Sequence, residues 1–492
     1  MTENLGNGPR KTATGRLLYF IFSIALIFAG FLADTRSVSA APIPAPGTFA
    51  LPAFARKYSM PCSACHDSWP RLSPFGQAFK DNGYQLMNEK DAPIWQNPGY
   101  WPVTFRITPI WHRENTNRVA VDGPVVGGVT TTVEGNVTTH GFDWSGLDFH
   151  TAGTLARNIS FYVLPSSDST GTFHFESVWA RLDNLFQSSW FNVKVGKFEL
   201  DNLQSEKRIL TLSNVGGSYQ NYHFQPLVSP GSAGNLVAAE GLYKFGIGDN
   251  QVGIEWMGHS KNDRTRISAS LLNSNDGNPG FSSGNGGGGL ATGRAYDGYV
   301  TASQAFEAGS LGLQRVGGFA YVGGAPTSCQ FMSGGSCTSF PGVGYKNKMF
   351  YRAGFIGMWF VKKFDVTTMY FHGWDNVSLT ASGPDTAPPS GARSPSWNGA
   401  LIEPHYTVNP RLVFIGRYEA IRMQQQVLAT NPSSFGNMDV GTAGMRFYPF
   451  LSSRAGFALH TEYSWLRQRG AAPVTGNDLT SSSVLLGLDF AF

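Results

Sequence analysis

Apolar and polar residues alternate through most of the chain after about residue 103. In residues 103–107, 173–176 and 191–198 the apolar side chains occupy every second position. This is the period of a β-strand with one apolar and one polar face. No hydrophobic period of 3.6 residues persists for long, so a helical bundle or a coiled coil is not expected. The pattern predicts a mainly β protein.

The predicted strands are joined by connections of two lengths. Residues 155–162, 358–366 and 406–413 each join two strand patterns across a very short turn. Other connections, such as residues 273–293 and 377–397, are long and rich in Gly, Ser, Pro and Asn. Short turns that alternate with long loops are typical of an outer-membrane barrel, with the turns in the periplasm and the loops outside.

The end of the chain carries the same pattern. One face of the last predicted strand holds Val484, Leu486, Leu488, Phe490 and the terminal Phe492. An apolar face with a terminal aromatic residue resembles the closing strand of bacterial outer-membrane proteins. About sixteen or seventeen strand-like segments can be placed, and single-chain bacterial barrels have even strand numbers, which favours sixteen. We therefore predict an antiparallel barrel of about 16 strands over residues 101–492, in contact with outer-membrane lipid. A soluble sandwich or propeller would alternate similarly, but no blade-length repeat is visible.

Composition excludes several other classes. Charged residues make up 14% of the chain against a usual value of about 25%, while aromatic residues reach 13%. Few charges and many aromatic residues argue against disorder. The net charge of +4 and the lack of a Lys/Arg cluster give no reason to expect nucleic-acid binding.

The first forty residues have the pattern of an export signal. Arg10, Lys11 and Arg16 precede an apolar stretch at residues 17–32, and small residues at 38–40 form a cleavage pattern. We predict a signal peptide over residues 1–40, with an uncleaved anchor helix as the alternative. Export places the mature chain in an oxidising compartment, where cysteines pair or carry cofactors.

Cys62, Cys65 and His66 form the attachment pattern of a c-type haem. Two thiols at this spacing reach the two vinyl groups of one porphyrin as thioethers, while the adjacent imidazole meets the iron. His66 is thus the predicted proximal ligand. A thioredoxin-like pair would need a βαβ surround, which is missing, and a zinc site would need two more ligands, of which only His112 is near in sequence. We predict one covalent haem c in a small helical cytochrome segment at residues 41–100.

The second axial ligand has several candidates. Met87 follows residues 75–86, which can form a short helix that folds back over the haem, and it is the preferred distal ligand. His112, Met60 or an open site are the alternatives. Met87 could also serve only as core packing.

The remaining cysteines, Cys329 and Cys337, bracket a Gly/Ser-rich segment. We predict a disulfide between them that stiffens the loop locally, with a redox-active disulfide as the alternative.

Together, the export signal, one haem motif and a C-terminal barrel resemble the fused monohaem cytochrome–porins, the outer-membrane iron oxidases of iron-oxidising bacteria. The resemblance is specific over about residues 49–90 and architectural over the barrel. It is carried by the haem motif and by Phe54, Ala55, Arg56, Pro70, Leu72, Pro74, Phe75, Gly76, Phe79, Lys80, Gly83 and Tyr84.

The resemblance implies an electron-transfer function. The protein would oxidise extracellular Fe(II) as an iron oxidase and pass the electron to a periplasmic cytochrome. Glu114, Asp122 and Glu134 are candidate loop carboxylates for transient contact with Fe(II), and ordinary solvated loops are the alternative. The alternative functions are an outward electron conduit and a porin whose haem segment is a plug. No P-loop, Gly-x-Ser-x-Gly elbow or His-Glu-x-x-His motif supports hydrolase or transferase chemistry. For packing around the haem we expect Trp69, Phe75, Phe79, Trp95 and Trp101, with ordinary core packing as the alternative for each.

Overall fold

The computed structural model describes most of the chain beyond residue 52, in one compact unit that spans residues 49–492. The described residues are 53–58, 60–68, 71–86, 91, 93–96, 103–167, 171–200, 219–230, 245–248, 250–273, 296–327, 331–333, 336–339, 347–382, 386–451 and 456–491. The predicted signal peptide lies outside them. Among these residues, no helix is both long and apolar enough to cross a membrane.

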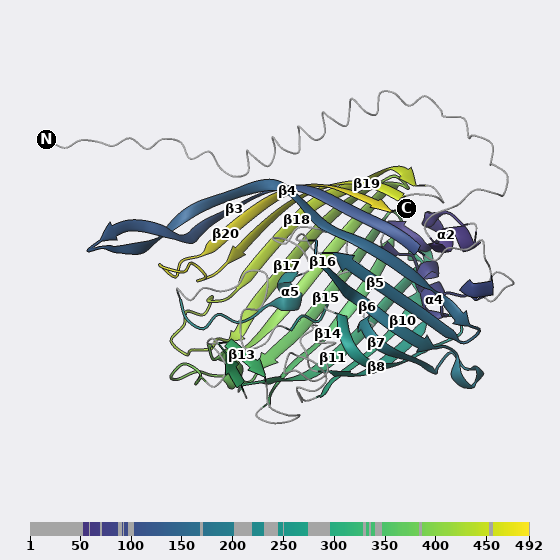
Figure 1. Cartoon of the computed structure of the whole chain (residues 1–492), viewed down its shortest axis with the longest axis horizontal. Helices are drawn as coiled ribbons and strands as arrows, with labels where there is room; N and C mark the ends of the chain where they lie inside the picture. The colour runs from purple at the N-terminus through teal and green to yellow at the C-terminus, as the bar shows by residue number, and fades with distance from the viewer. Residues whose placement is uncertain are drawn as a thin grey trace. The chain divides into compact units, whose positions relative to one another are not determined.

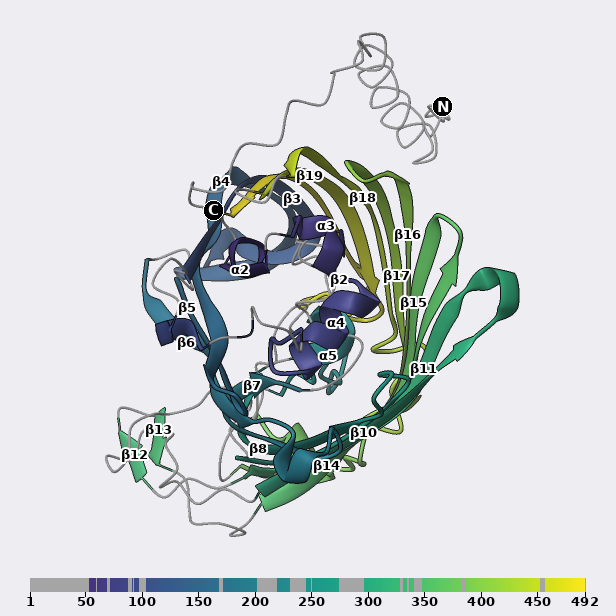
Figure 2. The same ribbon diagram turned by 90° about the vertical axis from the view of Figure 1, so that its right-hand side faces the viewer.

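Sixteen antiparallel strands form one closed barrel, which confirms the predicted mainly β barrel and its strand number (Figures 1 and 2). The last strand closes the ring by pairing with the first, from Ser481 opposite Thr116 to Ala491 opposite Arg106. The barrel strands are β3 (Val103–Val126), β4 (Val129–Ala156), β5 (Ile159–Ser167), β6 (Phe173–Leu182), β7 (Asn192–Glu199), β8 (Asn250–His259), β9 (Thr265–Asn273), β10 (Tyr296–Glu307), β11 (Leu313–Pro326), β14 (Asn347–Val361), β15 (Phe364–Asp375), β16 (Ser396–Asn409), β17 (Leu412–Gln425), β18 (Met438–Leu451), β19 (Gly456–Gln468) and β20 (Leu479–Ala491).

Shorter elements precede the barrel or lie in its connections. The helices are α2 (Ala53–Tyr58), α3 (Cys62–Cys65), α4 (Pro74–Asp81) and α5 (Tyr219–His223), and the 3-10 turns are η2 (Ile94–Gln96), η3 (Leu185–Gln187), η6 (Gly309–Leu311) and η7 (Val377–Thr380). Two small ladders pair β1 (His66–Ser68) with β2 (Arg71–Leu72), and β12 (Phe331–Ser333) with β13 (Ser336–Ser339).

The two faces of each strand meet different surroundings. In β20 the predicted apolar face is outward, with Leu486 and Leu488 exposed, while Leu485 and Asp489 are buried inside. The same contrast holds around the ring. Exposed outward residues include Leu182, Ile254, Val300, Phe355 and Phe414, and buried inward polar residues include Arg181, Glu255, Glu403, Arg417 and Arg446. An apolar outer band around a polar interior is suited to lipid.

The short turns gather at one end of the barrel. The three predicted hairpins are confirmed, with turns at residues 157–158, 362–363 and 410–411. Because β3 begins and β20 ends at this same end, we call it the short-turn end, and the opposite end the long-loop end. Long connections such as residues 274–295 and 376–395 join strands at the long-loop end. By the rule for such barrels, the short-turn end faces the periplasm.

The first two strands extend beyond their neighbours. β3 has 24 residues and β4 has 28, yet β20 pairs with β3 only as far as Thr116 and β5 pairs with β4 only from Leu147. The remainder forms a two-stranded ribbon that projects at the long-loop end (Figure 1). Glu114, Asp122 and Glu134 therefore lie in strands, and our expectation of loop positions for them was wrong.

A part of the β7–β8 connection folds into the barrel. The backbone N–H of Asn221 donates to Glu419 at 3.3 Å, and its side-chain amide donates to the Ala400 carbonyl at 3.1 Å. Phe245 packs on Tyr321 and Phe350, with ring centroids 4.4 and 4.8 Å away. Figure 2 shows α5 within the ring of strands, so this connection occupies part of the interior.

Candidate haem site

The segment that carries the haem motif lies inside the short-turn end. Figure 2 looks into this end and shows α2, α3 and α4 surrounded by the strands. The sequence around Ser73 explains why α4 begins there. The Ser73 hydroxyl accepts from the backbone N–H of Gly76 at 3.1 Å, and Pro74 occupies the first turn. A serine cap followed by proline is a favoured start for a helix.

The haem motif forms a single helical turn. Cys62 and Cys65 are the first and last residues of α3, and residues three apart lie on one face of a helix. His66 follows directly as the first residue of β1. Cys65 and His66 are half-buried. The backbone thus presents both cysteine positions and the histidine in the order that covalent haem attachment needs.

Helix α4 is packed directly against the motif through its backbone. A Cβ atom on Gly76 would lie 2.0 Å from the Cys65 carbonyl oxygen, so only glycine permits this approach. The same carbonyl accepts from the Ser73 backbone N–H at 2.8 Å, and the Ser73 hydroxyl donates to the Ala64 carbonyl at 3.2 Å. These contacts hold α3 and α4 in one fixed arrangement.

Behind the motif, aromatic side chains form a small core. Phe79 contacts Phe54 and Tyr58 edge-on, with centroid distances of 5.1 and 5.3 Å. Tyr84 stacks on Phe54 at 4.9 Å and on Trp179 of the barrel wall at 6.2 Å. Burial raises the pKa of Tyr84 well above its usual value, so its hydroxyl stays protonated. The segment therefore shares a hydrophobic core with the barrel.

The predicted haem-packing residues have different environments. Phe79 is buried in this core, whereas Phe75 is 43% exposed. Trp95 is 67% exposed and donates its indole N–H to the Leu155 carbonyl at 2.8 Å. Trp69 and Trp101 lie outside the described residues. Of the described residues in this set, Phe75 is nearest in sequence to Gly76, the residue that packs against α3.

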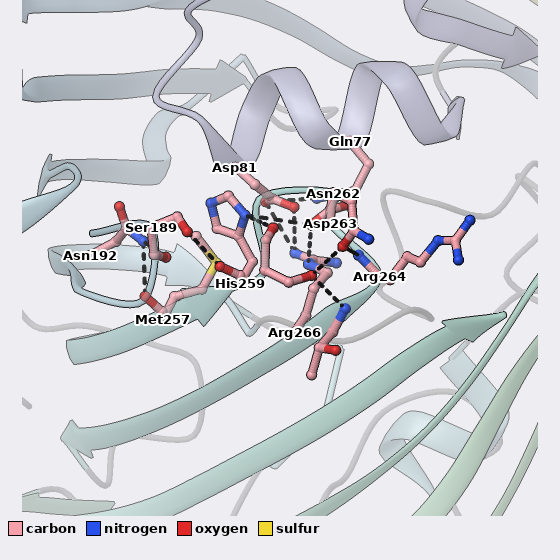
Figure 3. A network of polar contacts seen from close by, with 12 residues as sticks. Gln77, Asp81, Ser189, Asn192, Met257, His259, Asn262, Asp263, Arg264 and Arg266 are labelled. Carbon is pink, nitrogen blue, oxygen red and sulfur yellow. Dashed lines mark hydrogen bonds and ion pairs between the residues drawn. The ribbon is translucent and has the colours of Figure 1, made fainter. Parts of the chain in front are cut away.

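A buried ionic network joins α4 to the barrel wall (Figure 3). The Asp81 carboxylate meets the Arg266 guanidinium at 2.9 Å, and Gln77 donates to the same carboxylate at 3.0 Å. Arg181 of β6 donates to the carbonyls of Lys80 and Asp81 at 2.7 and 3.2 Å. A cation at the carbonyl end of a helix is favourable, because those carbonyls lack intrahelical partners.

The network continues into the β8–β9 turn. Asp263 lies 3.7 Å from Arg266 and 3.9 Å from His259, and Figure 3 shows these side chains converging below α4. The β8–β9 turn is also held to the β6–β7 connection that contains η3, since the Ser189 hydroxyl donates to the His259 carbonyl at 2.7 Å. Sequence reasoning missed Asp81, Arg181 and Arg266, whose pairing joins distant parts of the chain and leaves no local signal.

The candidates for the second axial ligand lie in different places. Met87, the preferred one, lies outside the described residues and stays a prediction. Met60 is half-buried and packs against the aromatic core. His112 lies on β3, with its Nδ1 atom 3.9 Å from the Glu114 carboxylate. Within the described ranges, no group of three or more His, Cys, Asp or Glu residues could hold a separate metal ion.

The second cysteine pair is described only in part. Cys337 lies in β13 opposite Met332, in a two-stranded ladder. Cys329 lies outside the described residues, so the predicted disulfide stays a prediction.

Comparison with known proteins finds similarity in fold alone. No protein-family model and no curated protein matches the chain. Among solved structures, an anion-selective porin from Comamonas acidovorans is 11% identical, with a TM-score of 0.45 over 79% of this chain and 99% of that one. OprB from Pseudomonas putida is 10% identical, with a TM-score of 0.43 over 79% and 94%. A loop-deletion mutant of OmpT from Vibrio cholerae is 10% identical, with a TM-score of 0.42 over 79% and 99%.

The closed ring itself decides the location. All sixteen strands pair with two neighbours, so the barrel has no open edge, and its outer face is apolar. A closed barrel satisfies every backbone group internally and can therefore stand in lipid. The protein is a bacterial outer-membrane β-barrel. Within it, the haem motif lies at the end that carries the short, periplasmic turns.

Proposed function

We propose that this barrel is an outer-membrane c-type cytochrome that carries electrons across the outer membrane. It would oxidise extracellular Fe(II), as an iron oxidase, and pass the electrons to a periplasmic cytochrome. The observation that supports the proposal is the haem-attachment turn of α3, packed inside the periplasmic mouth of the barrel.

The motif in this mouth would hold one haem c. Cys62 and Cys65 would carry the two thioether bonds and His66 would be the proximal ligand, while Met87, outside the described residues, would be the distal one. When bound, the haem supplies one-electron redox chemistry. In this proposal residues 41–100 form the monohaem cytochrome domain.

The surrounding residues would position the motif. Gly76 and Ser73 hold α4 against α3, which fixes the position of Cys65 relative to α4. Asp81 fixes the other end of α4 to Arg266 in the barrel wall. Oxidation of Fe(II) needs no catalytic acid or base, so the chain has only to bind the haem, orient it and control access to it.

A redox titration followed by Fe(II) addition tests the proposal. We expect a potential high enough to accept electrons from Fe(II), and reduced-haem absorption bands that appear after Fe(II) is added to the oxidised protein. The matched control is Gly298→Ala in β10, where an added Cβ atom meets nothing within 4 Å and the motif is untouched, so it should behave like the wild type.

Two outcomes would reject the proposed function. If the purified protein carries no covalent haem, it is not a c-type cytochrome. The second outcome is a haem of low potential that Fe(II) does not reduce above a buffer blank, at a pH where the transfer is favourable. The remaining functions would then be an outward electron conduit or a porin whose haem segment is a plug.

A further inference from the structure

The short turns carry an excess of positive charge. We define the basic rim as the exposed basic residues of these turns: Arg157, Lys261, Arg264, Lys362, Lys363 and Arg411. They come from the turns after β4, β8, β14 and β16, so they are distributed around the short-turn end. The exposed acidic residue beside them, Glu307 at the end of β10, pairs with Arg264 at 3.0 Å.

The rest of the basic rim has no carboxylate partner within the described part of the chain. Asp263, which lies in the same turn as Lys261, is directed to Arg266, Arg315 and His259 instead. Lys363 donates to the Val408 carbonyl at 2.8 Å, which leaves its charge uncompensated. The rim is therefore a region of net positive charge around the mouth that holds the haem motif.

Three basic residues at the long-loop end differ from the rim in this respect. Arg422 pairs with Asp439 at 2.5 Å, while Arg467 and Arg469 share Asp478 at 2.5 and 2.6 Å. These three charges are compensated locally, whereas five of the six rim residues have no carboxylate partner among the described residues.

We infer that the basic rim is a docking surface for an acidic, soluble one-electron carrier in the periplasm. This inference rests on the proposed function, since it assigns the class of partner that collects the electron. Complementary charge steers a partner to its site and orients it there, and such steering weakens as salt screens it. The transfer moves one electron from the reduced haem of this chain to the oxidised carrier, with no bond formed or broken and no proton exchanged.

Binding of two soluble monohaem c-type cytochromes of similar size, one acidic and one basic, tests the inference. The full protein is immobilised in detergent micelles, and the dissociation constants are measured over a range of ionic strength. We expect the acidic probe to bind about ten-fold more tightly than the basic one at low salt, and to lose this advantage near 0.5 M salt, where the Debye length falls to about 4 Å.

A matched pair of variants isolates the rim. Lys362→Glu with Arg411→Glu changes the rim, and Arg113→Glu with Lys348→Glu makes the same change in net charge on the long-loop side of β3 and β14. We expect the rim variant to weaken the acidic probe about five-fold or more, and the control to leave its affinity nearly unchanged. Lys362→Gln with Arg411→Gln gives a milder version of the same test if charge reversal impairs folding.

The outcomes separate the inference from the proposed function. Equal affinity for both probes, or no effect of the rim variants, would overturn the inference. In a further outcome, the rim variant loses binding to phosphatidylglycerol in nanodiscs while the acidic probe shows no charge-dependent binding. That result would assign the rim to lipid headgroups and would also overturn the inference. Tight, rim-dependent binding without electron transfer would leave the docking surface standing and reject the proposed function.

Discussion

At the scale of single residues, the contact between Asp81 and Arg266 is the one we expect to be most sensitive. Both side chains are almost fully buried, at 3% and 4% exposure. Removal of one partner leaves a buried charge without its nearest counter-ion, and such changes cost about 3–5 kcal/mol. We predict that Arg266→Gln or Asp81→Asn loosens the N-terminal segment, seen as faster proteolysis near α4 and loss of hydrogen-exchange protection there.

An exposed pair at the same turn provides the control. Arg264 and Glu307 are 45% and 55% exposed, so Arg264→Gln should change the stability of the segment little. The double variant Asp81→Leu with Arg266→Met should recover much of the lost protection, because it removes both charges. If either single variant kept wild-type protection, the pair would not anchor the segment.

The residues of the haem motif have separable roles. We predict that Cys65→Ala removes one thioether bond, so that less haem stays with the protein on a denaturing gel, and that His66→Ala changes the optical spectrum and abolishes most electron transfer. Absorption spectra of the folded protein and haem staining of the gel measure the two effects. Wild-type spectra and activity in His66→Ala would contradict the proximal assignment.

At the scale of elements, the contact between α3 and α4 depends on the absence of a side chain at residue 76. A Cβ atom there would overlap the Cys65 carbonyl, so the helices must separate to admit one. We predict that Gly76→Ala destabilises the segment by about 1–3 kcal/mol, as overpacked sites do. It should also reduce haem incorporation, which the ratio of haem absorbance to protein measures.

Gly298 in β10 is the matched control for this substitution. An added Cβ there meets nothing within 4 Å, and Gly298→Ala should incorporate haem as the wild type does. Equal loss of haem in both variants would show that the defect arises from barrel assembly and not from the α3–α4 contact.

A second element-scale prediction concerns the β19–β20 loop. Burial raises the pKa of Asp478, but hydrogen bonds from Arg467 and Arg469 outweigh it and hold the pKa below its usual value. A carboxyl whose pKa is lowered by folding stabilises the loop at neutral pH, and this contribution is lost as pH falls through the folded-state pKa. We predict that limited proteolysis of the loop accelerates below about pH 4.

Asp478→Asn separates this effect from general acid unfolding. The variant should be cleaved readily at neutral pH and should show little further increase on acidification. An unchanged pH profile in the variant would place the sensitive group elsewhere.

The elements that sequence reasoning could predict are those whose signal is local. A strand between lipid and a polar interior alternates with period two, so β20 could be predicted from Leu486, Leu488 and their polar neighbours. Pairs such as Arg266 with Asp81, which are 185 residues apart, carry no such signal, because each looks like an ordinary charged residue on its own element. Asp122 and Glu134 were misplaced for a related reason, since the ribbon continues past the barrel through a segment whose Gly and Pro residues look like a loop.

At the scale of the whole molecule, two insertions approach the interior from opposite ends. The N-terminal segment enters at the short-turn end, where Tyr58, Phe79 and Tyr84 are buried against the wall. The β7–β8 connection enters from the long-loop end, where Asn431 donates to the Val228 carbonyl at 2.9 Å and Phe224 packs on Trp397. Because both insertions share buried contacts with the strands, the described residues occupy part of the barrel interior from both ends.

This arrangement predicts the electrical behaviour of the protein. In planar bilayers the full chain should conduct far less than an open sixteen-stranded porin, because side chains occupy its mouth. Variants that release the segment, such as Arg266→Gln, should show frequent openings, while Arg264→Gln should not. A large, steady conductance in the wild-type protein, unchanged in the Cys62→Ala variant, would instead identify a diffusion porin. Low conductance combined with reduction by Fe(II) would mean that electrons cross the membrane through a barrel that solutes do not.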